Sequence, residues 1–561
     1  MPNLLASRWG RLTAFFFLYV TEGIPLGFAA TAIATQLRRQ DVGPAEIGAF
    51  VGSFYLPWAF KWAFGPFIDV FTSEKLGKRR GWIIGTQIML IITLLACTGL
   101  NLPSQLGLLT SVLLIHNSFG AMQDVAIDAL AVNTLSEDER GLANGIMFGG
   151  AAIGTAVGGS GVLFLMPYIG IKGGFVFVAA CIALVTIFIA LPLQEKPTPE
   201  AERREAGLAS AGRAIVKFAD ETFRSFHGSR GAFTGVFFAL LPAGAMSLGL
   251  ALQSNVAVEV GMNDDEVAWL SLWSQVIAAG CMVLGGLLSD KLGRRRMLGL
   301  YLVLMSPPAL YLAWKLQMHG WVMPNPAEGK VGHREASLVL ISAVWVSSLA
   351  YAVGQGLMYG TRTAAFMDVT NPKVAATQFT AYMAMMNLAI SYSATWQGIA
   401  AEAFGYPITL VLDAITGPLC VLLLPFMAPS KGAGLADDRA AGRARLLALV
   451  LAFGCVCWVA YSLGVFGAGP ARPMWETLFT LVSIASAVYL LAGAATRRAE
   501  GSGLRTAGLA MAGLLIVTYF MRKWQPQLGD VYAVVGVAAA AVLLLTARLS
   551  WHELRPAPAA A

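Results

Sequence analysis

The sequence predicts an all-α, polytopic membrane protein that has two six-helix halves and about two to four extra C-terminal transmembrane helices. Hydrophobic residues make up 57% of the 561 residues and charged residues only 13%, whereas a soluble domain carries about 25% charged residues. Apolar stretches of roughly 20 residues recur along the chain, which is the length that crosses a bilayer as a helix. A short polar motif also recurs at matching places in the two halves.

The first half offers six apolar stretches. They are Leu12–Ala34, Ile47–Val70, Trp82–Leu100, Leu106–Leu135, Ala143–Met166 and Phe175–Leu193. Arg8 and Arg11 precede the first stretch, as basic residues precede the apolar core of a signal peptide. However, Glu22 and Pro25 interrupt the place of that core, and the stretch is long enough to span. We therefore expect an uncleaved first helix.

The second half gives about six further stretches, and more apolar sequence follows it. The six are Phe233–Val256, Val267–Ser289, Met297–Gln317, Leu338–Tyr359, Ala375–Ala401 and Pro407–Met427. These patterns predict four regions: an N-terminal six-helix half (1–193), a cytoplasmic connector (194–232), a C-terminal six-helix half (233–428) and a hydrophobic C-terminal extension (429–561).

Basic residues in the short loops predict the orientation of the chain. Lysine and arginine are enriched in cytoplasmic loops, and a cytoplasmic N-terminus places Lys75–Arg80 and Lys291–Arg296 on that side. Arg38–Arg39 and Arg522–Lys523 are the exceptions. We therefore predict a multi-pass protein with its N-terminus in the cytoplasm and its apolar helices in the lipid bilayer.

Composition and spacing also exclude several classes of function. The net charge of +7 comes from dispersed loops, so the contiguous basic face needed to bind nucleic acid is not expected. The six cysteines lie in apolar stretches without a CxxC pair or a histidine cluster. We therefore expect no metal site and no cofactor. No nucleophile–base pair or phosphate-binding loop is recognisable, so the chain is not predicted to be an enzyme.

The recurring motif joins the second and third helices and, about 221 residues later, the eighth and ninth. Its residues are Gly65, Asp69, Arg79 and Arg80 in the first copy, and Gly286, Asp290, Arg294 and Arg295 in the second. We expect the glycines to allow close helix packing and the aspartates to pair with basic residues at the membrane surface. A helix end in water would explain either copy alone, but not two copies in register.

The motif resembles the loop signature of the major facilitator superfamily. That resemblance implies a transporter with alternating access between two repeated halves. In such a protein, the motif would act as a conformational latch that holds one closed state and opens as the halves rock.

Ionisable side chains within a membrane span are costly, so each is a functional candidate. Glu22 lies midway in the first helix, Lys61 lies in the second, and Asp124 and Asp128 lie one turn apart in the fourth. A lysine among carboxylates would offset part of their desolvation cost, and a carboxylate left without a partner suits a proton carrier. We predict these four residues as proton-coupling candidates. A permanent salt-bridge network, with Asp128 as a helix cap, is the structural alternative.

Other polar and aromatic residues within the spans are candidates for the substrate pathway. They are Trp58, Trp62, His116, Asn117, Gln123, Gln355, Tyr359, Asn387 and Trp396. The aromatic side chains could stack on sugar rings, although most transmembrane aromatics serve packing or lie in interfacial belts. We expect Arg362, on the same helical face as Gln355 and Tyr359, to extend to the cytoplasmic interface.

The first half carries a closer resemblance. Its motifs, in order, are Phe60-Lys61-Trp62, Gly65-Pro66, Asp69, Gly77-Lys-Arg-Arg-Gly-Trp82, Thr86-Gln87, Gln123-Asp124-Val-Ala-Ile-Asp128-Ala129 and Leu135-Ser-Glu-Asp-Glu-Arg-Gly141. Together they resemble the AmpG-type muropeptide permeases. This resemblance implies proton-driven import of anhydro-muropeptides, which are sugar-peptides from cell-wall turnover, across the bacterial inner membrane. Siderophore permeases and acetyl-CoA transporters share these features more loosely.

The chain also departs from the muropeptide permeases. It has Leu130-Ala-Val-Asn133 and Gly149-Gly-Ala-Ala-Ile-Gly154 where those permeases carry a basic residue and a Tyr-Arg pair. The cargo therefore stays open between an anhydro-muropeptide-like solute and a siderophore or acetyl-CoA-like anion. A non-transporting membrane receptor is a third alternative. We expect the partners to be a small-molecule substrate and protons, and the protein to be a monomer.

Overall fold

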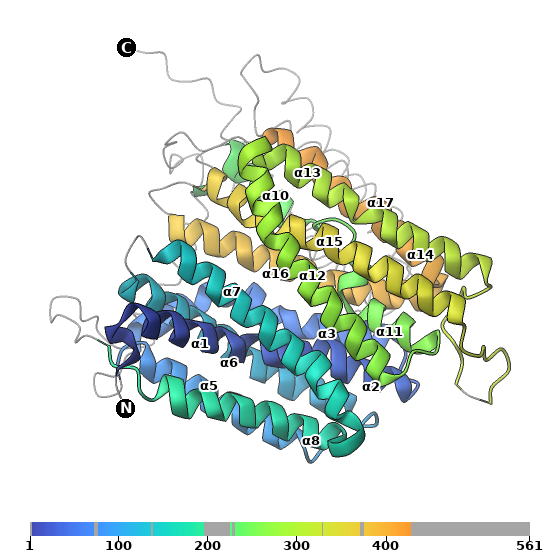
Figure 1. Ribbon diagram of the computed structural model, residues 1–561, viewed down its shortest axis with the longest axis horizontal. Coiled ribbons are helices and arrows are strands. Elements are labelled where there is room, and N and C mark those ends of the chain that lie inside the picture. Colours follow the sequence, from blue (N-terminus) through green and yellow to red (C-terminus); the bar gives the residue numbers. More distant parts are fainter. Residues whose placement is uncertain are drawn as a thin grey trace, which may run out of the picture. The chain divides into compact units, whose positions relative to one another are not determined.

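The computed structural model describes residues 3–71, 77–135, 139–195, 225–226, 230–327, 329–370 and 375–427 (Figure 1). Most of the predicted connector and the whole extension from residue 429 onward lie outside these ranges. The extra C-terminal helices and the division of the chain into four regions therefore stay predictions.

Helices form all the regular structure of the described residues in the first half. They are α1 (Arg8–Gly27), η2 (Phe28–Ile33), α2 (Ala34–Arg39), α3 (Pro44–Ala59), α4 (Lys61–Val70), α5 (Arg80–Cys97), α6 (Leu106–Thr134), α7 (Arg140–Ala156), η3 (Val157–Gly161), α8 (Val162–Val185) and η4 (Thr186–Ala190). A short helix, η1 (Leu4–Ala6), precedes them. Each predicted apolar stretch of this half coincides with one or more of these helices.

Helices also form the regular structure of the described residues in the second half. Its elements are α10 (Arg230–Leu240), η6 (Ser247–Gly249), α11 (Ala251–Glu259), α12 (Asp264–Leu292), α13 (Arg294–Leu304), α14 (Ser306–Met318), α15 (Leu338–Val369), α16 (Ala375–Phe404), α17 (Tyr406–Thr416) and η8 (Gly417–Phe426). Within the described residues, seven helical segments are long and apolar enough to cross a membrane. The prediction of an all-α, polytopic membrane protein is confirmed.

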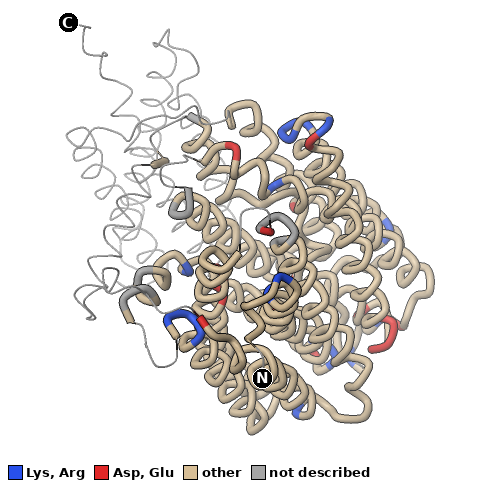
Figure 2. The backbone as a smooth tube through the Cα atoms, turned by 60° about the vertical axis from the view of Figure 1, so that its left-hand side comes forward, with Lys and Arg blue, Asp and Glu red and all other residues tan. Residues whose placement is uncertain are grey.

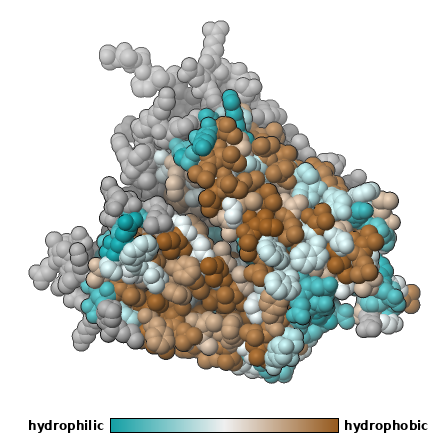
Figure 3. Space-filling model, in the orientation of Figure 1, coloured by the Kyte–Doolittle hydropathy of each residue, from teal (hydrophilic) through white to brown (hydrophobic). Residues whose placement is uncertain are grey.

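Large apolar side chains lie on the outside of these helices, as expected for a protein surrounded by lipid. Ile92 on α5 and Leu287 on α12 are 51% and 56% exposed. Hydrophobic side chains cover much of the face seen in Figure 3. Lysine, arginine, aspartate and glutamate lie mostly at turns and helix ends in Figure 2. The charged residues inside the helices are therefore few and stand out.

The chain forms two compact units. The first comprises residues 1–219, 242–363 and 383–418, and contains every predicted site residue. The second comprises residues 220–241, 364–382 and 419–561. In the described part of the second unit, Phe366 packs against the rings of Phe238 and Tyr382, and the Tyr382 hydroxyl donates a 2.6 Å hydrogen bond to the carbonyl of Ala232.

Glycines bring α1 into backbone contact with α7 and with η3, which continues α7. A Cβ atom at Gly154 would lie 2.3 Å from the carbonyl oxygen of Val20, and one at Gly158 would lie 1.9 Å from that of Ile24. No side chain fits at these distances, so the two helices can approach this closely only because glycine has no Cβ. This contact fixes α1, and with it Glu22, inside the first unit.

The turns after the first and seventh spans share a backbone conformation and a hydrogen bond. They are a second feature, besides the loop motif, that recurs in both halves. Asp41 and Gly261 both have positive φ angles, of 61° and 104°. The next residue bonds back into the preceding helix in each case, from Val42 N to Leu37 O and from Met262 N to Ala257 O. Both turns thus have the hydrogen bond of a Schellman cap.

Candidate functional site

A buried ion pair joins α4 to α6. Lys61 Nζ lies 2.9 Å from Asp124 Oδ2, and their side chains are 14% and 6% exposed. Lys61 is the first residue of α4, which follows a break in the second span at Phe60. Pro57 precedes that break within α3 and removes a backbone donor. The break therefore starts a new helix at the lysine.

Two residues of α1 complete the charged cluster. The Tyr19 hydroxyl donates a 2.6 Å hydrogen bond to Asp128 Oδ1. Glu22, one turn further along α1, interacts electrostatically with Asp124, Asp128 and Lys61, and its Oε1 atom is buried without a hydrogen-bond partner. The structure thus brings together all four predicted proton-coupling candidates and adds Tyr19, which the sequence reasoning had missed.

The charges of this cluster do not balance. It holds three carboxylates, and Lys61 is the cation that interacts with them among the described residues. Several ionised carboxylates close together in a medium of low polarity repel one another strongly. The cluster can lower this cost by holding a proton or by pairing with a cationic group, and this is the chemistry that it offers.

Two predicted pathway residues lie in buried hydrogen-bond networks. Gln123 Nε2 donates to Thr21 Oγ1 at 2.9 Å, and Gln87 joins the same hydroxyl at 3.4 Å. His116 Nδ1 lies 2.8 Å from Thr93 Oγ1 on α5. Both Gln123 and His116 are fully buried. In this structure their contacts hold α6 to α1 and α5.

The remaining candidates of the first half line the contact between α6 and the second span. Asn117 Nδ2 donates to the carbonyl of Phe54 on α3. The ring of Trp58 lies 3.8 Å from the position that a Cβ at Gly120 would take. Trp58 and Trp62 are both half-buried.

In the second half, Gln355 and Tyr351 on α15 face the seventh span. Their polar atoms lie 2.7 Å and 2.8 Å from the position of a Cβ at Gly249. Arg362, predicted to extend to the interface, is instead 4% exposed, with its guanidinium 4.6 Å from the centre of the Tyr359 ring. The prediction for Arg362 was wrong because its helical face packs inside the protein.

Asn387 and Trp396 lie half-buried on α16.

The seventh span is interrupted inside the apolar sequence, and a buried aspartate holds the interruption. Helical structure stops at Leu240 and resumes with α11, apart from the single turn η6. Asp413 Oδ2 accepts hydrogen bonds from the backbone N–H groups of Met246 and Ser247, both at 2.8 Å. Asp413 Oδ1 accepts one from Gln397 Nε2 at 2.9 Å. Irregular backbone at membrane depth needs such partners.

A second buried ion pair links α2 to α11 and was also missed. Arg38 Nε lies 2.8 Å from Glu259 Oε1, with side chains that are 6% and 2% exposed. The Tyr406 hydroxyl and the backbone N–H of Asn325 donate to the same carboxylate. Beside it, Arg39 pairs with Asp264. The two arginines that depart from the predicted positive-inside pattern therefore have acidic partners.

The two copies of the loop motif differ in the contacts described. Asp290, near the end of α12, pairs at 2.9 Å with Arg294, the first residue of α13, and is exposed, as is Arg295. The backbone N–H groups of Arg79 and Arg80 donate to Glu195. The side chain of Asp69 lies outside the described set, so its role in a latch stays a prediction.

The motif glycines make ordinary contacts, which differs from the expected close packing. A Cβ at Gly65 would lie 3.9 Å from Val125, and one at Gly286 would lie 3.6 Å from the Gly360 carbonyl. At Gly285, however, a Cβ would lie 2.3 Å from the Leu357 carbonyl. The close approach of α12 to α15 therefore depends on Gly285.

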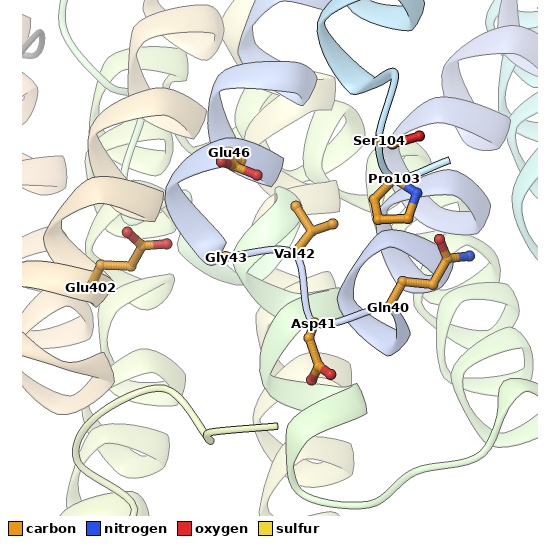
Figure 4. A pocket seen from close by; sticks show the side chains of 8 residues that line it. All are labelled: Gln40, Asp41, Val42, Gly43, Glu46, Pro103, Ser104 and Glu402. Carbon is orange, nitrogen blue, oxygen red and sulfur yellow. The ribbon is translucent and has the colours of Figure 1, made fainter. Parts of the chain in front are cut away.

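A cavity of about 460 Å³ lies beside the turn that follows the first span (Figure 4). Its lining residues are Gln40, Asp41, Val42, Gly43, Glu46, Pro103, Ser104 and Glu402. Predicted site residues are absent from this lining. Within the described residues, no group of three or more histidine, cysteine, aspartate or glutamate side chains could hold a metal ion.

Comparison with known proteins agrees with the fold. Residues 12–252 match the Major Facilitator Superfamily. The anhydromuropeptide permease of Escherichia coli K12 is 29% identical over 191 residues, which cover 34% of this chain and 38% of that permease. A Rickettsia felis protein named as an AmpG transporter is 23% identical over 375 residues, covering 66% and 84% of the two chains. A D-xylose–proton symporter structure matches with a TM-score of 0.56 at 13% identity over 76% of this chain and 99% of the symporter.

The fold and these matches indicate the class: the chain is an all-α, polytopic membrane protein with the fold of major facilitator transporters, and it is similar in sequence to the major facilitator superfamily over residues 12–252. Within that superfamily, its relatives support the AmpG branch. The resemblance that the motifs of the first half predicted is confirmed.

Proposed function

We propose that this transporter imports anhydro-muropeptide-like sugar-peptides across the bacterial inner membrane, driven by the proton gradient. The observation that carries the coupling is the unbalanced cluster of Glu22, Asp124, Asp128 and Lys61. The similarity to an anhydromuropeptide permease supports the cargo.

The geometry suggests how a proton would act. Tyr19 and Glu22 on α1 face the carboxylates of α6, so the charge of the cluster affects how tightly the two helices hold together. Protonation of one carboxylate removes repulsion within the cluster. Loss of that proton to the cytoplasm would restore the repulsion and favour another arrangement of the helices. The proton gradient could thereby bias the conformational cycle.

Uptake into proteoliposomes tests this proposal. With a proton gradient imposed, the purified chain should accumulate labelled anhydro-muropeptide, and a protonophore should abolish accumulation. Glu22→Gln and Asp124→Asn should lose accumulation, whereas Asp265→Asn, which changes an exposed carboxylate, should retain it. Gradient-independent uptake would contradict the coupling. No uptake of this probe, together with uptake of a siderophore or an acyl-CoA, would assign the alternative cargo.

The proposal includes a cytoplasmic N-terminus and a monomeric transporter. A single cysteine placed at Ser7 in a cysteine-free background should react with a membrane-impermeant maleimide only after the cells are opened. Reaction in intact cells would reverse the proposed topology. Light scattering of the detergent-solubilised protein should give the mass of one chain.

A further inference from the structure

The helix α15 carries a buried cation, Arg362, within an apolar segment. Arg362 lies within the apolar helical segment Leu338–Val369 and is 4% exposed. A positive charge buried at such a place is costly, and it is usually paired with an acid or serves a function.

Arg362 differs from Lys61 and Arg38 in lacking an acidic partner among the described residues. Lys61 pairs with Asp124, and Arg38 pairs with Glu259. Arg362 forms no ion pair with any described residue, and its Nε atom is buried without a hydrogen-bond partner. The ring of Tyr359 lies against the guanidinium. A ring on the face of the guanidinium leaves the edge, which carries the N–H donors, available.

A buried carboxylate of this region, Asp413, is already occupied. Asp413 and Arg362 both act electrostatically on Tyr351, which places all three in one neighbourhood. However, Asp413 accepts three hydrogen bonds that hold the interrupted seventh span and Gln397. Its two oxygens are therefore committed to other donors.

Further polar groups lie on the same face of α15. Tyr351, Gln355 and Tyr359 precede Arg362 at helical spacing, and Gln355 reaches the interrupted segment at Gly249. A broken helix beside polar side chains is a common setting for a solute site in transporters. These side chains therefore offer neutral hydrogen-bonding groups that lead to Arg362, a cation without an acidic partner among the described residues.

We propose that Arg362 anchors an anionic group, a carboxylate or a phosphate, of the transported solute. Tyr359 holds the plane of the guanidinium, and two N–H groups on its edge bind the two oxygens of the anion. This inference rests on the proposed function, because it assigns the carboxylates of a sugar-peptide to this residue. It also supplies a cation for an anionic solute, although the chain lacks the basic residues that related permeases carry elsewhere.

A pair of probes tests the assignment through binding to the purified full-length chain. One probe is anhydro-muropeptide with free carboxylates, and the other has those carboxylates converted to carboxamides. Arg362→Gln should weaken binding of the first probe by about 10- to 100-fold, the factor expected for a hydrogen-bonded charge, and leave the second unchanged. Arg8→Gln, at an arginine that is 53% exposed, should match wild type. Equal weakening for both probes would overturn the proposal.

A second measurement does not depend on the cargo. Inorganic phosphate should raise the thermal unfolding temperature of the wild-type chain, and Arg362→Gln should remove this response while leaving the phosphate-free protein at least as stable. An equal response in the variant would overturn the anion site. If wild type binds neither muropeptide probe, the proposed cargo fails, and the phosphate response still decides the role of Arg362.

A lipid phosphate is the competing source of the anion. Side chains on the outside of the helices, where lipid would lie, are well exposed, as Leu287 on α12 is at 56%. Arg362 is only 4% exposed, which argues against contact with a lipid headgroup. The phosphate response should be the same in phosphatidylcholine and in phosphatidylglycerol vesicles. Loss of the response only in phosphatidylglycerol would mean that a headgroup occupies the site, and would overturn the assignment to a solute.

Discussion

At the scale of the residue, the Lys61–Asp124 pair offers the clearest test of the charged cluster. The pair is buried, so removal of one partner leaves the other charge uncompensated, at a cost of about 3–5 kcal/mol. Lys61→Met should therefore lower the thermal unfolding temperature of the detergent-solubilised protein.

The double variant Lys61→Met/Asp124→Asn should recover most of that loss, because no isolated charge then remains at the pair. It should still fail to accumulate substrate. Full transport by the stable double variant would mean that the pair is structural, which is the alternative that the sequence left open.

Charged residues within predicted spans identified members of the candidate site, but only where the predicted ends of the span were correct. Glu22, Lys61 and Asp124 were found because they interrupt long apolar stretches. Glu259 was missed because it lies just beyond the predicted end of its span. Asp413 lies inside a predicted span, and the same rule could have found it. The burial of Arg362 depends on how α15 packs, which helical spacing alone does not reveal.

At the scale of the element, the glycine contact between α1 and α7 predicts a position-specific cost. Gly154→Ala should destabilise the protein by about 1–3 kcal/mol, because its methyl group would meet the Val20 carbonyl. Gly149→Ala on the same helix meets nothing within 4 Å and should not be destabilising. Thermal unfolding in detergent compares the two. Equal stability would show that the helices separate easily.

The aspartate that holds the interrupted seventh span gives a second prediction. Asp413→Asn replaces a carboxylate that accepts three hydrogen bonds, and should cost about 1–3 kcal/mol. Hydrogen exchange of residues 242–250 should accelerate. Thr409→Val on α17 is the control, because among the described residues that hydroxyl donates to the Gly405 carbonyl, one turn earlier in the chain. Unchanged exchange in Asp413→Asn would contradict the assigned role.

The positions of the helices followed from hydropathy, whereas their internal breaks did not. The predicted apolar stretches coincide with helices in the described residues. The interruption at 241–250 and the break at Phe60 were not predicted, although Pro242 and Pro57 lie in or near them. Proline allows a break, but hydrogen bonds from distant residues such as Asp413 stabilise it, and these depend on the fold.

At the scale of the whole molecule, the Arg38–Glu259 pair predicts a conformational bias. It joins α2 to α11 at equivalent turns of the internal repeat, so separation of these turns during transport must break it. Glu259→Gln should favour the separated state by at least about tenfold, given the cost of an unpaired buried charge.

Alkylation of a cysteine at position 255 measures this bias, because Asn255 is fully buried on α11. Glu259→Gln should increase its reaction with a membrane-impermeant maleimide. Asp264→Asn removes the more exposed pair and should have a smaller effect. Equal reactivity in wild type and Glu259→Gln would mean that the pair does not control access.

The central claim is that the cluster around Asp124 couples a proton to solute entry. Proteoliposomes that contain a pH-sensitive dye measure this coupling directly. With no gradient imposed, addition of anhydro-muropeptide outside should acidify the lumen of vesicles that hold the wild-type chain, and should not do so with Asp124→Asn. Acidification by the variant equal to that of wild type, or solute entry into wild-type vesicles without acidification, would contradict the account.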